Sequence, residues 1–261
     1  MNVGIAEQNG AGLAAGLATC GKIPFVVTYA VFGSLRMCEQ IRQEICYPNL
    51  NVKIACSHGG VTPANDGASH QCIEDMGVLR TLPNMTVIMP ADYWSARKLV
   101  AAAAEMNGPC YLRFTRDAIP VIYDENTTFE IGKANLLKDG KDVAIIANGL
   151  MVAEAIEAGK ILAEAGISAR IINMATIKPL DEELVLKAAK ECGKIITCEE
   201  HNILGGLGEA VCGVLAEKCP TPVRRIGVND EFGHSGPAAA LLKQFGLSAE
   251  HIVEVAKEFC K

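Results

Sequence analysis

Short apolar runs recur along this chain of 261 residues, and segments with helical spacing of apolar residues separate them. In the first half, the runs that we predict to be strands are residues 2–5, 24–29, 52–56, 85–89 and 111–114. The helices predicted between them are residues 7–20, 32–46, 72–82 and 93–106. Strands that alternate with helices are typical of parallel βαβ units, so we expect one parallel sheet of five strands. In the helix at 32–46, the spacing places Leu35 and Ile41 on the buried face.

A polar stretch then interrupts the pattern. Residues 121–141 contain the run Asp-Glu-Asn-Thr-Thr and the turn Lys-Asp-Gly-Lys, which together indicate a linker between domains. A second series follows, with strands predicted at 143–147, 169–174, 194–198 and 223–228 and helices at 151–165, 181–191, 206–218 and 249–259. The sequence therefore predicts an α/β fold made of two α/β domains, 1–120 and 142–261, each with a mostly parallel sheet.

The amino-acid composition limits the classes of binding partner and the cellular compartment that we expect. The net charge of −6 argues against nucleic acid, because phosphate neutralisation needs clustered Lys and Arg. The 11 cysteines form no CxxC pair, and most lie in apolar runs, which indicates buried thiols in a reducing compartment. No apolar stretch approaches the length of a transmembrane helix. We therefore expect a cytoplasmic protein that binds neither nucleic acid nor membrane.

Residues 57–71, SHGGVTPANDGASHQ, form a Gly-rich loop that gathers His58, Asp66 and His70. The loop follows a predicted strand and precedes a predicted helix, and ligands of open α/β sheets bind at that edge. One alternative is a surface loop in which Asp66 and Ser69 only cap the next helix. A metal site of two His and one Asp is a second alternative, which the spacing disfavours because it matches no compact ligand motif.

Several motifs, in this order, carry a resemblance to a known family. They are residues 2–9 (NVGIAEQN), the pair Tyr29 and Phe32, the loop from His58 to Gln71, residues 82–92, Arg116 ahead of Pro120, residues 178–181 (KPLD), 199–201 (EEH), 205–208 (GGLG) and 232–237 (FGHSGP). Together they resemble the carboxyl-terminal half of transketolase, and more closely the carboxyl-terminal subunit of split transketolases. In those enzymes, the diphosphate-binding domain is a separate polypeptide.

The resemblance implies thiamin diphosphate as the cofactor, with the protein supplying orientation and electrostatics around it. Glu7 matches the glutamate that hydrogen-bonds the pyrimidine ring, a role for which we expect burial to raise the pKa of the carboxyl, although the helix amino terminus favours the anion. Tyr29 and Phe32 match the aromatic residues that hold that ring. The alternative for Glu7 is a first-turn carboxylate that only serves its helix, and Tyr29 could instead belong to the core.

The resemblance also implies a substrate site for sugar phosphates. His58, Asp66 and His70 match residues that contact the sugar hydroxyls and the phosphate end, and Arg116 matches a phosphate ligand whose planar guanidinium binds two oxygens at once. A solvated surface arginine is the alternative for Arg116. Glu7 and His70 are the candidate catalytic residues, and no metal ligand is expected in this chain.

The diphosphate and Mg²⁺ ligands of the family belong to the other domain. The resemblance therefore implies an amino-terminal diphosphate-binding partner subunit, an assembly as a homodimer or heterotetramer, and no activity without that partner. Two departures are Ala64-Asn65, where the family usually has Gly-Glu, and Leu35, where many members have another aromatic residue. The first domain also starts later than in the family, so we expect it to be truncated at its amino terminus.

Two other functions stay open at this point. The chain could be a truncated, non-catalytic relative that acts as a binding module, or it could resemble the synthase that makes 1-deoxyxylulose 5-phosphate from pyruvate and glyceraldehyde 3-phosphate. The synthase has a similar loop, but His58 and the surroundings of Arg116 fit transketolase better. A neighbouring gene for a diphosphate-binding domain would favour the enzyme over the binding module.

Overall fold

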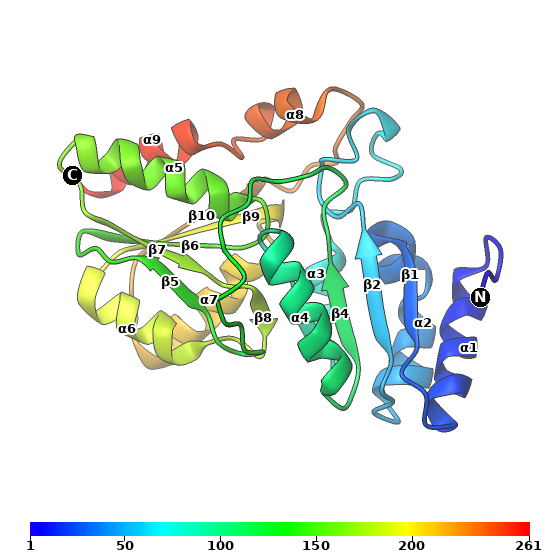
Figure 1. Cartoon of the computed structure of the whole chain (residues 1–261). Helices are drawn as coiled ribbons and strands as arrows, with labels where there is room; N and C mark the ends of the chain where they lie inside the picture. Colours follow the sequence, from blue (N-terminus) through cyan, green and yellow to red (C-terminus); the bar gives the residue numbers. More distant parts are fainter.

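The computed structural model describes residues 1–261 and contains two five-stranded sheets that lie side by side (Figure 1). The first sheet has the order β1-β2-β4-β3-β8. Its four parallel strands are β1 (Phe25–Tyr29), β2 (Lys53–Ser57), β4 (Cys110–Arg113) and β3 (Thr86–Ile88). The fifth strand, β8 (Thr176–Lys178), comes from the second half of the chain and pairs with β3 in antiparallel orientation. The second half therefore completes the first sheet.

Helices cover both faces of the first sheet. They are α1 (Glu7–Thr19), a helical run made of η1 (Phe32–Arg36), α2 (Cys38–Gln40) and η2 (Ile41–Cys46), α3 (Asp75–Arg80) and α4 (Tyr93–Glu105). Buried Ala11, Ala14 and Ala15 let α1 pack closely into the core on one face, and Leu99 and Ala103 of α4 pack on the other. Helix α4 begins at Asp92, whose carboxylate accepts the main-chain N–H of Ser95 in a capping box.

The second sheet has the order β10-β9-β6-β7-β5. Its strands are β10 (Val223–Val228), β9 (Ile195–Asn202), β6 (Val143–Ala147), β7 (Ala169–Asn173) and the antiparallel edge strand β5 (Asn135–Lys138). Alternate residues of β6 face opposite sides, with Ile145 packed in the cluster of α5 (Met151–Glu164) and α9 (Ala249–Phe259), and Ile146 in that of α6 (Glu182–Cys192) and α7 (Leu207–Lys218). A short helix, α8 (Ala238–Gln244), precedes α9.

Most predicted elements are present, but three predictions were wrong. Residues 2–5 form no strand, because the chain turns at Gly4 (φ 76°), whose N–H donates to Asn2 Oδ1, and Ile5 is exposed. The fifth strand of the sheet is therefore β8, and that sheet is not wholly parallel. In the run from 32 to 46, i→i+5 hydrogen bonds such as Met37 N–H to Phe32 O rotate the face, so that Met37 is buried and Leu35 is exposed.

The segment predicted as a linker contains strand β5, and α8 was not predicted because seven residues are too few to show a helical period. No helix is both long and apolar enough to cross a membrane. The carboxyl ends of β1, β2 and β4, together with the loops that follow them, form the edge of the sheet where the predicted site residues lie.

Candidate active site

The loop at 58–71 leaves the end of β2 and is closed at its base by main-chain hydrogen bonds. Gly60 N–H donates to Cys72 O (2.6 Å), and Cys72 N–H donates to Gly60 O (3.0 Å). Just before this bridge, Gly59 N–H donates to Phe114 O (3.1 Å), at the end of β4. Gly60 has a φ of 84°, a conformation that glycine adopts without strain. The loop is thus a defined structure, and neither Asp66 nor Ser69 caps α3, whose N-cap residue is Glu74.

Four rings gather where the loop meets β1 and η1. The rings of Tyr29 and His58 are stacked, with centroids 3.7 Å apart and planes at 16°. Tyr29 and Phe32 lie nearly parallel, with centroids 6.2 Å apart and planes at 12°. His70 meets both aromatic rings edge-on, at 6.2 Å from Tyr29 and 5.5 Å from Phe32. The ring cluster, defined as Tyr29, Phe32, His58 and His70, therefore unites residues from three separate segments, and Tyr29 remains 37% exposed.

His58 is held in an unusual backbone conformation. Its φ of 64° lies in the left-handed region, where a non-glycine residue costs about 1–2 kcal/mol. Its Nδ1 lies 2.8 Å from Ser57 Oγ. Burial lowers the pKa of His58, the nearby charge of Arg116 lowers it further, and Asp66 and Asp117 oppose the shift. The ring is therefore neutral at neutral pH and can both donate and accept a hydrogen bond. Strain of this kind is typical of functional sites.

Asp66 and Arg116 form an ion pair beside the ring cluster. Arg116 Nη1 lies 3.1 Å from Asp66 Oδ2 and donates to the main-chain oxygen of Pro63 (2.6 Å). Both side chains are more than one third exposed. The other N–H groups of Arg116 have no acceptor in the protein, so this guanidinium can still bind an anion. This pair makes no hydrogen bond to His58, but the charges of Arg116 and Asp66 both influence the pKa of His58.

Glu7 reaches the ring cluster through Arg36. Arg36 Nη1 donates to Glu7 Oε2 (2.9 Å), and the Arg36 guanidinium lies over the Phe32 ring, 4.4 Å from its centroid. Partial burial raises the pKa of Glu7, but the hydrogen bond from Arg36, the main-chain N–H of Glu7 and the charge of Arg36 outweigh it, so the net pKa is lowered. Burial therefore acts in the expected direction, but the net pKa is not raised, because Arg36 supplies a cation that the motif did not show.

The position of Arg36 indicates what kind of group fits here. A flat cation lies on the Phe32 face and donates a hydrogen bond to a carboxylate whose side chain is 11% exposed. A flat heteroaromatic ring with a hydrogen-bonding nitrogen could occupy the same place and make both contacts. Arg36 is 47% exposed, so it can move away. No group of three or more His, Cys, Asp or Glu side chains is arranged to hold a metal ion.

A buried hydrogen-bond network beneath the site contains residues that the motifs did not single out. Arg113 and Asp75 form an ion pair (Nε to Oδ2, 2.7 Å) with both side chains 0% exposed, and Tyr111 donates to the same carboxylate oxygen (2.6 Å). Arg113 also donates to the main-chain oxygens of Cys72 and Glu200. A charged residue at the end of each of two apolar strands, β4 and β9, was the available signal for this network.

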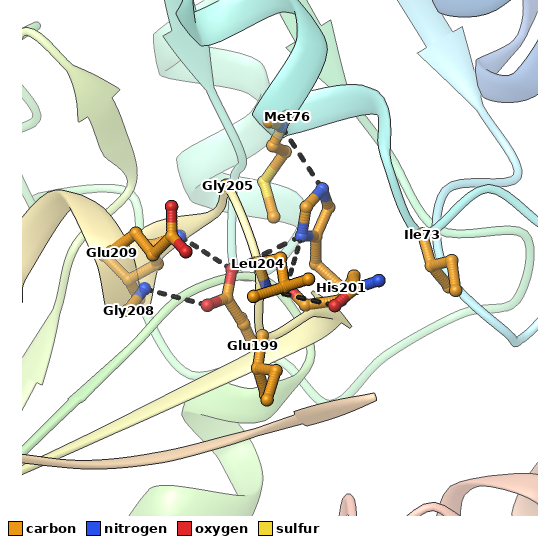
Figure 2. A network of polar contacts seen from close by, with 12 residues as sticks. Ile73, Met76, Glu199, His201, Leu204, Gly205, Gly208 and Glu209 are labelled. Atoms are coloured by element: carbon orange, nitrogen blue, oxygen red, sulfur yellow. Dashed lines mark hydrogen bonds and ion pairs between the residues drawn. The ribbon is translucent and has the colours of Figure 1, made fainter. Parts of the chain in front are cut away.

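Strand β9 carries the triplet Glu199-Glu200-His201 to the contact between the two halves. Glu199 accepts the N–H groups of Leu207 (2.7 Å) and Gly208 (2.8 Å) at the start of α7, and His201 Nε2 accepts the N–H of Gly77 in α3 (3.2 Å). Figure 2 shows Glu199, His201 and Gly208 in this network. Glu200 faces the loop at 58–71 instead. The triplet therefore joins α7, α3 and the loop through buried polar groups.

Comparisons with known proteins agree with the motifs. The family model "Transketolase, pyrimidine binding domain" matches residues 1–121, and "Transketolase, C-terminal domain" matches residues 132–252. A transketolase C-terminal section from Methanocaldococcus jannaschii is 49% identical over 263 residues, covering 100% of this chain and 82% of that protein. A 6-deoxy-6-sulfo-D-fructose transketolase subunit from Clostridium sp. is 43% identical, covering 99% of this chain and 80% of that protein.

A solved structure is similar throughout the chain. It is described as "Split gene transketolase, inactive beta4 tetramer", and it is 50% identical with a TM-score of 0.93, covering 99% of this chain and 83% of that one. The overall fold of the chain is thus that of a known architecture.

Proposed function

We propose a function from the premise that the chain belongs to the transketolase family, as both family models and its relatives show. The protein is the carboxyl-terminal subunit of a thiamin-diphosphate-dependent transketolase, and it transfers a two-carbon ketol unit between sugar phosphates together with a separate diphosphate-binding subunit. The observation that carries this proposal is the ring cluster beside Glu7, because it combines an aromatic platform, a carboxylate and two histidines at one sheet edge.

The residues present fit the pyrimidine half of the cofactor. Phe32 and Tyr29 would hold the ring, and Glu7 would bind its ring nitrogen in place of Arg36. The cofactor, when bound, supplies the nucleophilic carbon that accepts the two-carbon unit. We assign the diphosphate and its Mg²⁺ to the partner subunit, which the description of the solved relative as a split-gene enzyme supports.

The substrate residues divide by charge. The neutral ring of His58 and the ring of His70 would contact the hydroxyl and carbonyl oxygens of the ketose, with His70 moving a proton at the reacting end. Asp66 would accept hydrogen bonds from further hydroxyls. The unoccupied N–H groups of Arg116 would bind the anionic end of the sugar. The Clostridium relative is named for a sulfonated sugar, so the anionic end is the shared chemistry and it need not be a phosphate.

The partner subunit or a second copy of the chain would cover the exposed side of β1 and α1. Phe25 and Val27 of β1 and Leu13 and Leu17 of α1 are all exposed, with Val27 at 74%. Exposed apolar side chains on an edge strand and on the neighbouring helix fit an interaction surface.

Reconstitution tests the proposal. The purified chain is mixed with the diphosphate-binding subunit of the same organism, thiamin diphosphate and Mg²⁺, and ketol transfer is measured between a ketose phosphate donor and an aldose phosphate acceptor. We expect transfer only when both chains are present. Transfer that fails for every ketose donor, while pyruvate and glyceraldehyde 3-phosphate are consumed, would replace transketolase with the synthase. No turnover with either substrate set would favour a binding module.

A further inference from the structure

The loop that carries His58, Asp66 and His70 belongs to the first sheet, yet a residue of the second sheet holds it. Glu200, at 0% exposure, accepts two main-chain hydrogen bonds on the single oxygen Oε1, from Val61 N–H and Thr62 N–H, each at 2.8 Å. Val61 is three residues after His58, so the Glu200 carboxylate binds the loop close to His58, whose backbone is in the left-handed region.

We propose that Glu200 is a positioning residue of the active site: it fixes the loop at 58–71 from the second domain and thereby sets His58 against Tyr29. The inference rests on the proposed function for its consequence in catalysis, whereas the positioning itself is independent of it. Glu200 lies behind the loop and contacts its main chain, so it acts through His58 and is not itself catalytic.

The fit between Glu200 and the loop is specific. A Cβ added at Gly60 would lie 2.1 Å from Glu200 Cδ, so the loop can approach this carboxylate only because residue 60 is glycine. The loop also has a second anchor on the same domain, because Gln71 Nε2 donates to Val61 O and to His234 O, both at 3.0 Å. Glu200 of β9 therefore binds Val61 and Thr62 directly, and His234 in the loop after β10 binds Gln71, which in turn donates to Val61 O.

The backbone of β9 does not depend on the carboxylate. Arg113 Nη2 donates to the main-chain oxygen of Glu200 (2.9 Å) and to that of Cys72 (3.1 Å), so it fixes the strand and the end of the loop whatever side chain residue 200 carries. The Glu200 carboxylate can thus be replaced without leaving Arg113 unpaired, since Asp75 still binds it.

The surroundings of Glu200 argue for positioning over stability. Oε2 of Glu200 has no hydrogen-bond partner, and burial raises the pKa of Glu200 to about 7 although Arg113 and the two N–H groups act in the opposite direction. A buried carboxyl with an idle oxygen gains little net stability over an apolar residue. Glu200 Oε1 instead accepts the N–H groups of both Val61 and Thr62, and these two hydrogen bonds fix the position of the loop.

Glu199 offers a matched control one residue away. It is also 0% exposed and also accepts two main-chain N–H groups, but those belong to Leu207 and Gly208 within its own domain. It has no hydrogen bond to the loop. Loss of the Glu199 carboxylate should therefore loosen α7 and leave the loop in place, whereas loss of the Glu200 carboxylate should do the reverse.

The first test uses the isolated chain and needs no activity. The five histidines are labelled with ¹³C at Cε1, and their signals are assigned with single His→Gln variants. We expect Glu200→Met to shift the signals of His58 and His70, because the stack on Tyr29 changes. Glu200→Gln, which keeps the acceptor oxygen, should restore most of the wild-type shifts. Glu199→Met should move His201 and leave His58 and His70 unchanged.

The second test uses the complex with the diphosphate-binding subunit. Glu200→Met should raise KM for the sugar phosphate by about tenfold, the size expected for one lost positioning contact, while Glu199→Met should alter only the fraction of folded enzyme. Unchanged His58 and His70 signals in folded Glu200→Met would overturn the proposal, even in an active complex. If Glu200→Met does not fold, Gln71→Met is read by the same criteria. An inactive wild-type complex would refute the proposed function and leave the histidine result standing.

Discussion

Three arginine–carboxylate ion pairs surround the site, and they differ in how deeply they are buried. Arg113–Asp75 is fully buried between the sheets, whereas Arg36 of the Glu7 pair is 47% exposed and Arg116 of the Asp66 pair is 38% exposed. The buried pair connects main-chain oxygens of two segments and belongs to the framework. Each of the two exposed pairs contains a residue that we propose to bind the ligand. A ligand can replace one partner of such a pair with little loss of stability, because exposed ion pairs contribute little to it. The buried pair therefore belongs to the framework, and the exposed pairs to the proposed binding surface.

The same division appears in two carboxyl groups. Burial raises the pKa of Glu200 to about 7, whereas the Arg36 hydrogen bond and charge bring the pKa of Glu7 below its usual value despite partial burial. Glu200 faces main-chain N–H groups in the interior, and Glu7 faces a side chain that can leave. The contrast agrees with the proposal that Glu7 is the carboxyl that binds the cofactor.

The largest expected effect distinguishes the buried pair from an exposed one. Asp75→Asn removes the charge that faces Arg113 in the interior, so we expect the free energy of unfolding to fall by about 3–5 kcal/mol. The identical change at an exposed pair, Asp66→Asn, should lower it by less than about 1 kcal/mol. Urea titrations of both variants measure the difference. Equal losses would mean that burial does not separate these pairs.

The next effect is a dependence of stability on pH. The unfolded Glu200 carboxyl loses its proton near pH 4.5 and the folded one near pH 7, so the folded state binds more protons in between. This group should therefore destabilise the fold as the pH rises from about 4.5 to about 7, by up to about 3 kcal/mol. Glu200→Gln removes that slope.

Glu7 should act in the opposite direction. Its folded pKa lies below the unfolded value, so its contribution is present above pH 4.5 and is lost as the pH falls through the folded pKa. Glu7→Gln therefore serves as the matched variant for the same urea titrations at a series of pH values. Parallel pH profiles for Glu200→Gln and Glu7→Gln would contradict the assigned shifts.

Sequence patterns predicted most strands and helices here, and the reasons for the exceptions are physical. The β6 strand is a continuous apolar run because both of its faces are covered, which makes it easy to recognise. Strand β8 is three residues long and joins a sheet formed about 90 residues earlier, and no local pattern encodes such a pairing. Leu35 was misplaced because i→i+5 turns break the helical period.

The predicted site residues show the same limit. The motifs placed Tyr29, Phe32, His58 and His70 at one sheet edge, and the structure brings their rings together. Their roles stay a prediction. The partners of Arg36, Arg113 and Glu200 could not be assigned from the sequence, because each partner lies at least 29 positions away. Short-range spacing identifies a loop, whereas its charge environment depends on the whole fold.

The smallest expected effect on stability concerns Arg36, in the exposed ion pair with Glu7. Arg36→Ala should change the free energy of unfolding by less than about 1 kcal/mol, because the Arg36 side chain that is removed is 47% exposed. It should nevertheless raise the pKa of Glu7, since partial burial then acts without the opposing cation. A ¹³C NMR titration of the glutamate carboxyl carbons measures the shift. An unchanged Glu7 titration would show that Arg36 does not control this carboxyl.

The role of Glu7 is tested most directly by the turnover of the reconstituted complex carrying Glu7→Gln. We expect turnover to fall by at least about 100-fold, with cofactor affinity much less affected and unfolding free energy changed by at most about 1 kcal/mol. Glu39→Gln, an exposed residue of the neighbouring helical run that bonds only Gln40, should retain wild-type turnover. Wild-type turnover in the Glu7→Gln complex would mean that this carboxylate only begins helix α1, and the assignment of the active site would be contradicted.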